Sequence, residues 1–344
     1  MNYLPVSPDS LTQAAQILRN GGLVAFPTET VYGLGADAYN SAAIAKVFEV
    51  KERPRFDPLI IHISNVKTLE ETADLSLLRE DTRRKLFLLA ENLWPGPLSL
   101  VLPKNKKIPE IATAGLETAA IRFPAHKAAQ TLISLSGGAV AAPSANPFGS
   151  LSPTRAEHVR DKLGGKIDMI LDGGQSQIGV ESTVLDITGK SIKILRHGGT
   201  PKEEIEKLIG GVEDGFSKDQ DFNGQNLSSG LASPGQLKSH YSPQKPLSVF
   251  SIEEIISLPF ETDAAYLFFD GSARDAWLSA RERNSALIRT LSEKGLVLEA
   301  SARLFETLHE LEKCQISRIF AQLAPFAGLG AAINDRLTRA SIKS

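Results

Sequence analysis

The sequence GGLVAFPTETVYGLGAD, residues 21–37, combines a short apolar run with a dense group of polar side chains. The run at 23–26 lies between two glycines and a proline, which is typical of a buried strand. Within the five residues 28–32 the chain carries three hydroxyl groups and one carboxylate, on Thr28, Glu29, Thr30 and Tyr32. Polar groups at the end of a buried strand commonly build a small-molecule site. This stretch alone is also compatible with an ordinary strand followed by a polar turn.

Residues 33–38 fit the permissive GxGxxA pattern of dinucleotide-binding loops. The apolar run ends several residues before this pattern, and no acidic residue stands at the right place after a second strand. We therefore do not expect a dinucleotide site here. Gly33 and Gly35 indicate instead that the backbone bends or lies close to another group.

Length and composition set the broad class of the protein. At 344 residues the chain can form two domains, each with its own core. The formal net charge of −2 gives no overall basic field for nucleic acid, although a local basic surface is compatible with it. The single cysteine, Cys314, excludes an internal disulfide and a cysteine-based metal cluster. Without a long apolar stretch or a signal-peptide pattern, we expect a cytoplasmic protein with no membrane partner.

The order of apolar patterns predicts an α/β protein with two domains. Residues 1–209 are expected to form a domain with a twisted, mixed sheet, because strands and helices do not alternate strictly. The expected strands are 23–26, 59–63, 99–102, 118–123, 139–142, 168–171, 180–187 and 192–195. The expected helices are 10–20, 41–50 with Ser41 as N-cap, 75–93, 125–135 and 154–163.

The second half of the chain changes in composition. From residue 210 to 232 it is rich in Gly, Asp, Asn, Ser and Gln, which predicts a linker, and we extend this linker to residue 244. Residues 245–344 show the alternation typical of a small parallel α/β sheet. We expect strands at 247–250, 264–269, 296–298 and 318–322 and helices at 276–293, 302–313 and 331–341.

The candidate chemistry lies in the first domain. We find no P-loop, no GxSxG elbow and no HExxH motif. The domain offers cations and hydroxyl groups at the ends of its expected elements: Lys51, Arg53, Arg122, Ser144, Asn146, Ser182 and Arg196. Guanidinium groups bind carboxylate and phosphate oxygens bidentately. The set indicates phosphoryl or nucleotidyl transfer through positioning and charge neutralisation.

Several motifs, in this order, resemble those of YrdC-type threonylcarbamoyl-AMP synthases. They are PTETVYGLG (27–35), KERP (51–54), PLIIHI (58–63), LWPGPLSLVL (93–102), IRFPAH (121–126), APSAN (142–146), ESTVLD (181–186) and RHG (196–198). The SPG and HYSP motifs at 233–235 and 240–243 resemble the linker of the longer members, which join a YrdC-like domain to a small Rossmann-like domain. The resemblance covers nearly the whole chain.

The resemblance implies a specific reaction. The amine of L-threonine takes up CO2 from bicarbonate, and the resulting carbamate attacks the α-phosphate of ATP, so that threonylcarbamoyl-AMP and pyrophosphate form. Magnesium is expected to arrive with the triphosphate. A threonylcarbamoyl transferase then modifies the adenosine next to the anticodon of tRNA, and direct contact with tRNA or double-stranded RNA is a possible further property.

The resemblance also implies which residues form the site. Lys51, Arg53, Ser144 and Asn146 form the family's KxR and SxN signature, which we assign to catalysis. The threonine contacts fall on Thr30, His62, Arg122, the backbone of Ala142, and Ser182. The ATP contacts fall on Arg53, Asp57, Thr118, Ser144, Ser152 and Arg196, and Tyr241 resembles a residue that closes over the nucleotide. No protein metal ligand is implied.

Two of these assignments change what the residues alone predict. A single histidine within an apolar strand is usually a core residue, and the resemblance instead makes His62 a ligand. Many relatives carry Asn where this chain has Asp57, and an anionic side chain is repelled by a triphosphate unless it faces ribose, adenine or a metal. The sequence contains no obvious general base. The carbamate is already an anion, so we expect that its attack on ATP does not require one.

Two other functions are compatible with parts of the sequence. An RNA-binding or ribosome-maturation protein is compatible with the cations at 83–85 and 104–107, but not with the low net charge and the lack of aromatic RNA-binding motifs. A carbamoyl transferase of hydrogenase assembly also contains a YrdC-like module. The zinc-finger and acylphosphatase-like segments of such a protein are not found in this sequence.

Overall fold

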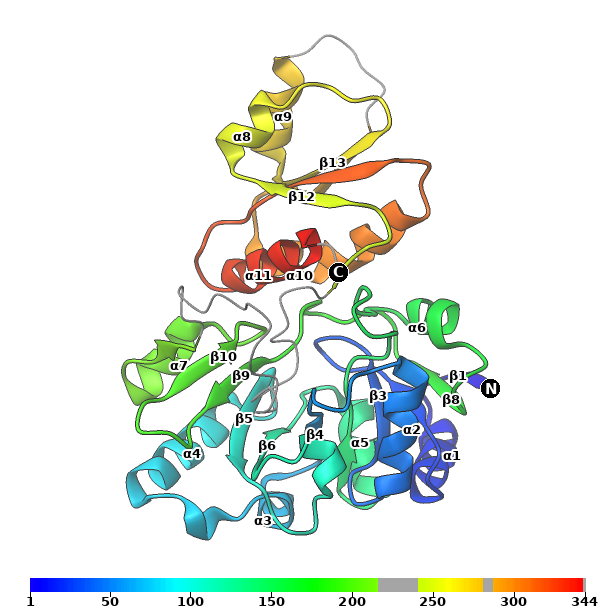
Figure 1. Ribbon diagram of the computed structural model, residues 1–344, viewed down its shortest axis with the longest axis vertical. Helices are drawn as coiled ribbons and strands as arrows, with labels where there is room; N and C mark the ends of the chain where they lie inside the picture. The colour runs from blue at the N-terminus through cyan, green and yellow to red at the C-terminus, as the bar shows by residue number, and fades with distance from the viewer. Residues whose placement is uncertain (216–240, 281–286, 343–344) are drawn as a thin grey trace.

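The computed structural model describes residues 1–215, 241–280 and 287–342 and contains two sheets (Figure 1). The larger sheet has eleven strands in the order β1-β8-β2-β3-β7-β4-β6-β5-β9-β10-β11. Parallel and antiparallel pairs both occur in it, so the predicted mixed sheet is confirmed. Its strands are β1 (Asn2–Pro5), β2 (Val24–Phe26), β3 (Gly33–Asp37), β4 (Ile60–Ile63), β5 (Leu98–Pro103), β6 (Thr118–Arg122), β7 (Ala139–Ala141), β8 (Met169–Asp172), β9 (Thr183–Asp186), β10 (Lys193–Arg196) and β11 (Glu213–Asp214).

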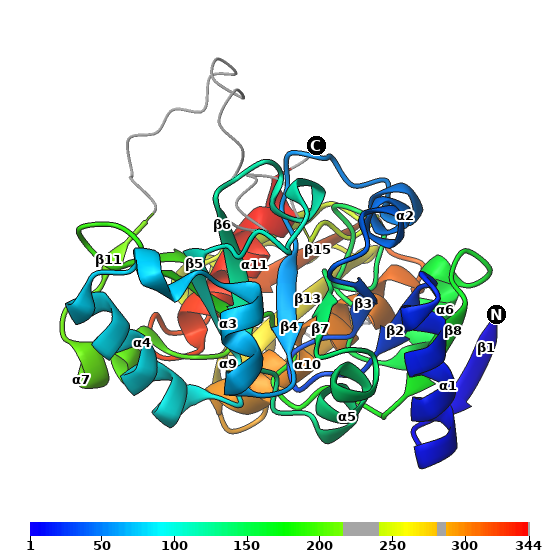
Figure 2. The ribbon, with the colours of Figure 1, turned by 90° about the horizontal axis from the view of Figure 1, so that it is seen from below.

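Helices lie along this sheet, as Figure 2 shows from below. They are α1 (Pro8–Arg19), α2 (Ser41–Lys51), α3 (Leu69–Thr72), α4 (Glu80–Leu93), α5 (Lys127–Leu135), α6 (Ala156–Leu163) and α7 (Lys202–Ile209). Short 3-10 helices occur at Val66–Thr68, Leu75–Leu77 and Glu110–Thr113. No helix among the described residues is long and apolar enough to cross a bilayer.

The smaller sheet is parallel throughout, as predicted, with the order β12-β15-β13-β14. Its strands are β12 (Leu247–Phe250), β13 (Ala264–Asp270), β14 (Leu287–Ser292) and β15 (Arg318–Gln322). Helices α8 (Ile252–Ser257) and α9 (Gly271–Ser279) cover the face away from the larger sheet, and α10 (Val297–Glu312) and α11 (Gly330–Ser341) lie between the sheets (Figure 1).

One apolar core joins the part of the chain that forms the larger sheet (the larger part) to the part that forms the smaller sheet (the smaller part). Along β13, Leu267 faces α10 and α11, whereas Tyr266 packs against Trp277 of α9, because successive strand residues point to opposite faces. The cluster around Leu267 also includes Val31 and Val180 from the larger part. The helices between the sheets are therefore packed against residues of the stretch 21–37 and of the segment that precedes β9.

Several predicted elements are corrected by the structure. The helix expected at 276–293 is wrong in its second half, since β14 pairs with β13 there, and the strand expected at 296–298 belongs to the start of α10. The N-cap of α2 is Asn40, whose Oδ1 accepts from the amides of Ala42 and Ala43, so Ser41 is the first helical residue. The helix expected from residue 75 begins at Glu80.

The two glycines of the GxGxxA pattern lie in a strand and not in a nucleotide-binding loop. Gly33 and Gly35 belong to β3, which pairs antiparallel with β2. A Cβ atom at Gly35 would lie 2.9 Å from Phe26 and 2.9 Å from Val140. The glycine is needed because the backbone of β3 passes directly over these two side chains.

Candidate active site

A pocket with about 530 Å³ of empty space lies where the connection from β2 to β3 meets the ends of β4, β6 and β10. Nine of the residues predicted for the site line it: Thr30, Arg53, His62, Arg122, Ala142, Ser144, Ser182, Arg196 and Tyr241. The motifs assign no contact to the other seven lining residues, of which Thr28 and Tyr32 belong to the polar group at 28–32: Thr28, Val31, Tyr32, Gly33, Ile60, Pro143 and Glu181.

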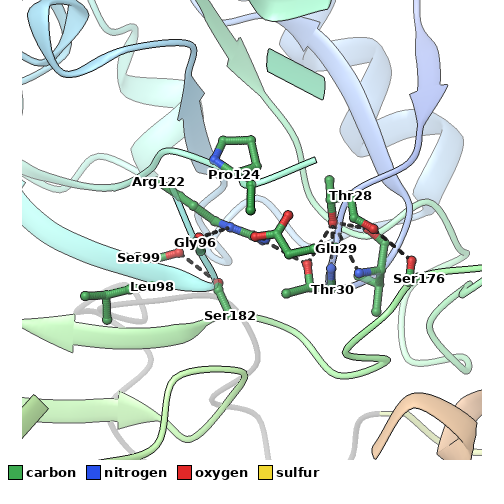
Figure 3. Close-up of polar contacts among 12 residues, drawn as sticks. Thr28, Glu29, Thr30, Gly96, Leu98, Ser99, Arg122, Pro124, Ser176 and Ser182 are labelled. Carbon is green, nitrogen blue, oxygen red and sulfur yellow. Dashed lines mark hydrogen bonds and ion pairs between the residues drawn. The ribbon is translucent and has the colours of Figure 1, made fainter. Parts of the chain in front are cut away.

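The connection after β2 is fixed by its own hydroxyl groups (Figure 3). The Thr28 hydroxyl donates to the carbonyl of Val31 at 2.6 Å and lies 2.8 Å from the Thr30 hydroxyl. Ser176 donates to the Thr28 carbonyl from a distant loop. These bonds satisfy the polar groups of a buried turn, so Thr30 is held in one orientation.

Arg122, at the end of β6, is a buried cation held by three partners (Figure 3). Its Nη2 lies 2.6 Å from Glu29 Oε1, its Nη1 donates to Thr30 at 2.9 Å, and its Nε donates to the Gly96 carbonyl. Burial would raise the pKa of Glu29, but the charge and hydrogen bond of Arg122 outweigh this and lower it. A guanidinium has five N–H donors, so these bonds leave two for an anionic ligand.

His62 is buried on β4 and is neutral at physiological pH. Burial, and then the charge of Arg122, lower its pKa to about 3. Its Nδ1 lies 3.2 Å from the carbonyl of Ile60. Because a carbonyl only accepts, Nδ1 carries the proton and Nε2 is an acceptor. A neutral imidazole of this tautomer can receive a hydrogen bond from a hydroxyl or an N–H group.

Ser182 and Arg196 form the opposite wall. The Ser182 hydroxyl lies 2.8 Å from that of Ser99 and accepts from Arg196 Nη2 at 3.1 Å. Arg196 Nε and Nη2 also donate to the Ser182 carbonyl. Burial lowers the pKa of Arg196, but a guanidinium stays charged in proteins. The wall therefore presents hydroxyl groups next to a fixed positive charge.

The KxR and SxN residues are brought together, but only Arg53 and Ser144 line the pocket. Lys51 is fully buried behind them, and its Nζ donates to the carbonyls of Ser144 and Asn146. The Asn146 amide donates to the carbonyls of Pro147 and Ser150. Lys51 and Asn146 thus determine the shape of the loop that carries Ser144.

Three residues predicted to bind ATP lie outside the pocket lining. Asp57 is fully buried, with Oδ2 2.9 Å from Arg53 Nη2, and burial raises its pKa against the effect of Arg53. Thr118 is the first residue of β6, roughly 13 Å along the strand from Arg122 at 3.3 Å per residue. Ser152 donates its hydroxyl to Glu181 Oε1.

Glu181 and Tyr241 connect the pocket to the rest of the molecule. Glu181 is buried, and its Oε2 pairs with Arg336 of α11 at 2.6 Å. Tyr241 has φ of 61° and packs on Phe305 of α10. The predicted linker motif at 233–235 and its residue 240 lie outside the described residues. Glu181 directly precedes Ser182 in the motif ESTVLD. This position next to a predicted threonine contact is the sequence feature that could have identified Glu181 as a pocket residue.

Comparisons with known proteins show the family of this chain. A family model for Sua5, YciO and YrdC proteins, described as telomere recombination, matches residues 16–198. A model described as threonylcarbamoyl-AMP synthase, C-terminal domain, matches residues 200–341. The threonylcarbamoyl-AMP synthase of Pyrococcus abyssi (strain GE5 / Orsay) is 40% identical over 337 residues, which cover 95% of this chain and 93% of the relative. The chain belongs to the threonylcarbamoyl-AMP synthase family.

Other relatives support the same membership. The threonylcarbamoyl-AMP synthase of Bacillus subtilis (strain 168) is 39% identical, covering 98% of this chain and 94% of the relative. The crystal structure of P. abyssi Sua5 complexed with L-threonine superimposes with a TM-score of 0.83 at 37% identity, covering 99% of this chain and 96% of the other. The predicted family, its two-domain form and the α/β fold class are confirmed.

Proposed function

We propose that this chain makes threonylcarbamoyl-AMP from L-threonine, bicarbonate and ATP and releases pyrophosphate. The observation that carries the proposal is one pocket with an Arg122 end suited to an amino acid and an Arg53–Arg196 end suited to phosphates. The relative crystallised with L-threonine shares the fold over nearly its full length. We also propose that the chain divides into a first domain at 1–209, a linker at 210–244 and a second domain at 245–344.

At the amino-acid end, Arg122 binds the threonine carboxylate with its two remaining N–H donors. The neutral His62 accepts from the threonine side-chain hydroxyl at Nε2, and Thr30 and Ser182 line the same end. The Ala142 backbone completes it. Because Glu29 already neutralises Arg122, the end selects a zwitterionic amino acid over a simple anion.

At the nucleotide end, Arg53, Ser144 and Arg196 neutralise the triphosphate. Bicarbonate first loses hydroxide to give CO2. The threonine nitrogen then bonds to the CO2 carbon and loses a proton, which leaves with the hydroxide as water. A carbamate oxygen then attacks the α-phosphorus, and the bond to the β-phosphate oxygen breaks, so that pyrophosphate leaves with that electron pair. Fixed cations accelerate such transfers through positioning and charge stabilisation. Lys51 and Asn146 act by holding the Ser144 loop, and Tyr241 covers the nucleotide.

Magnesium is assigned to the ATP and not to a protein site. Among residues 1–215, 241–280 and 287–342, no three His, Cys, Asp or Glu side chains come together as metal ligands. Glu181, the carboxylate in the pocket lining, is already bonded to Ser152 and Arg336. No step above uses a metal ligand of the protein.

The product is an activated acyl-adenylate. We propose that a threonylcarbamoyl transferase consumes it to modify tRNA beside the anticodon, in the cytoplasm. Contact of this chain with tRNA, and nucleotide contacts of Asp57, Thr118 and Ser152, belong to the same proposal.

The test is pyrophosphate release from ATP with bicarbonate and magnesium. Release should require L-threonine and should fall strongly when serine replaces it. The variant Arg53→Ala or Arg196→Ala should abolish release, while Asp57→Ala should have a smaller effect. Undiminished release by both arginine variants, or release independent of threonine, would contradict the proposal.

A further inference from the structure

Arg336 of α11 is a buried cation that reaches out of the smaller part of the molecule. Its side chain is 1% exposed, yet two of its partners, Glu181 and His197, belong to the larger part. Nε pairs with Glu181 Oε2 at 2.6 Å, and Nη1 donates to the carbonyl of His197 at 3.0 Å. Asp335 pairs with Nη1 from the same helix. The charge is thus compensated on both sides of the junction between the two sheets.

The partners of Arg336 surround the nucleotide end of the pocket. Glu181 lines the pocket, and its other oxygen accepts from Ser152. His197 directly follows Arg196, which is bonded to Ser182. The ring of Tyr241, also in the lining, has its centroid 4.9 Å from the Arg336 guanidinium carbon, within the range of a cation–π contact.

By contrast, within the described part of the chain Arg336 forms no hydrogen bond with Arg122, Thr30 or His62 of the amino-acid end. Arg122 is held by Glu29, Thr30 and Gly96, all within the larger part. Arg122, the residue proposed to bind the threonine carboxylate, is therefore supported independently of Arg336, whereas Ser182 directly follows Glu181 and is bonded to Arg196. Loss of Arg336 removes the ion-pair partner of the buried Glu181, which keeps the hydrogen bond from Ser152 and the influence of the Arg196 charge. A buried carboxylate that loses its ion-pair partner forces its surroundings to rearrange.

We propose that Arg336 is a positioning residue through which the smaller domain fixes the nucleotide end of the pocket. It acts by holding Glu181, the 196–198 segment and Tyr241 in place for ATP. The proposal rests on the proposed function, because it assigns Arg53, Arg196 and Tyr241 to the nucleotide. It gives the smaller domain a direct part in the active site.

A second ion pair across the same junction supplies the matched control. Arg155 Nε donates to Glu306 Oε1 of α10 at 2.7 Å, and Arg155 Nη2 donates to Gln175. None of these three side chains lines the pocket. Arg155→Met therefore weakens contact between the two parts without touching the nucleotide end.

The experiment compares Arg336→Met, Arg336→Lys and Arg155→Met by steady-state pyrophosphate release and by calorimetric binding of L-threonine alone. Arg336→Met should raise the KM for ATP by about 10-fold or more, the loss expected for a buried charged partner. Its threonine affinity should stay within about twofold, and Arg155→Met should keep both values within about twofold. The double variant Arg336→Met/Glu181→Gln should recover part of the ATP affinity, since no unpaired carboxylate remains.

Equal losses for ATP and threonine, or the same KM change in Arg155→Met, would overturn the proposal in favour of general domain docking. If Arg336→Met does not fold, Arg336→Lys tests the same difference between ATP and threonine binding. The lysine keeps the positive charge but lacks the planar guanidinium and its several N–H donors. If the wild-type protein releases no pyrophosphate, the proposed function fails instead. ATP binding measured by calorimetry then still tests Arg336: unchanged ATP affinity in Arg336→Met contradicts its positioning role.

Discussion

Lys51 and Ser144 are 93 positions apart in the chain and are joined by a 2.5 Å hydrogen bond from the ammonium Nζ to the carbonyl oxygen. The same ammonium donates to the carbonyl of Asn146. Burial, and then the charge of Arg53, lower the pKa of Lys51 well below its usual range. A lysine that resembles a phosphate ligand in the sequence is therefore, in the fold, the support of the loop that carries Ser144.

Lys51→Met should impair both stability and catalysis. It removes the donor of the buried Asn146 carbonyl, which costs about 1–3 kcal/mol, and it releases the Ser144 loop. We expect a lower melting temperature and a kcat/KM for ATP reduced about 10-fold or more. The control is Lys46→Met on the same helix, where an exposed lysine donates to the Gly21 carbonyl far from the pocket. Equal activity in the two variants would contradict this role of Lys51.

Arg122→Lys should weaken threonine binding although it keeps the positive charge. An ammonium cannot bond Glu29, Thr30, Gly96 and a ligand carboxylate together in the planar geometry of a guanidinium. We expect the threonine dissociation constant, measured by calorimetry, to rise by about 100-fold, as for a lost bidentate charged pair. ATP affinity in the absence of threonine should change little. A lysine variant with normal threonine affinity would show that Arg122 does not contact the amino acid.

His62 should make the stability of the fold decrease at acid pH. Threonine binding should not depend on His62 protonation near neutral pH, because the imidazole is neutral there. Its pKa in the folded protein is about 3, below the ordinary 6.5, so the unfolded chain takes up the proton first. The stability that His62 contributes is complete above pH 6.5 and decreases as the pH falls from there toward 3. The melting temperature of His62→Gln should therefore fall less between pH 7.5 and pH 5 than that of the wild type. Identical pH dependence would mean that His62 is not buried in its neutral form.

Gly35→Ala should destabilise the sheet beneath the site. Its Cβ would lie 2.9 Å from Phe26 and from Val140, so the core must shift, at about 1–3 kcal/mol. Gly211→Ala is the control, since no atom lies within 4 Å of its added Cβ. Thermal unfolding should show a clear decrease for the first variant and none for the second. A stable Gly35→Ala protein would contradict the close packing of β3 on β2.

The fold could be predicted from the sequence where local patterns are strong. Apolar runs bounded by glycine and proline placed most strands of the larger sheet, and its mixed character followed from the irregular alternation. The segment 287–292 was misassigned because β14 is held by pairing with β13, a contact that a local pattern does not reveal. The run 296–298 is too short to distinguish a strand from the first turn of a helix.

The site could be predicted in its residue types but not in its pairings. Motifs identified Arg122, His62 and Arg196, yet nothing local predicts that Glu29 neutralises Arg122 from 93 positions away. Arg336 lies 155 positions from Glu181, in a part of the chain without a recognisable chemical motif. Such pairs arise from tertiary packing, so the sequence alone indicates each charge but not its partner.

The most direct test of the central claim is to follow the carbon atom of bicarbonate. Protein incubated with 13C-bicarbonate, L-threonine, ATP and magnesium should yield threonylcarbamoyl-AMP carrying one 13C, detected by mass spectrometry, in equal amount to the pyrophosphate released. Arg122→Lys should yield far less of it at the same threonine concentration. Pyrophosphate formed without a labelled adenylate, or a labelled adenylate formed equally well without L-threonine, would contradict a pocket that joins these three substrates.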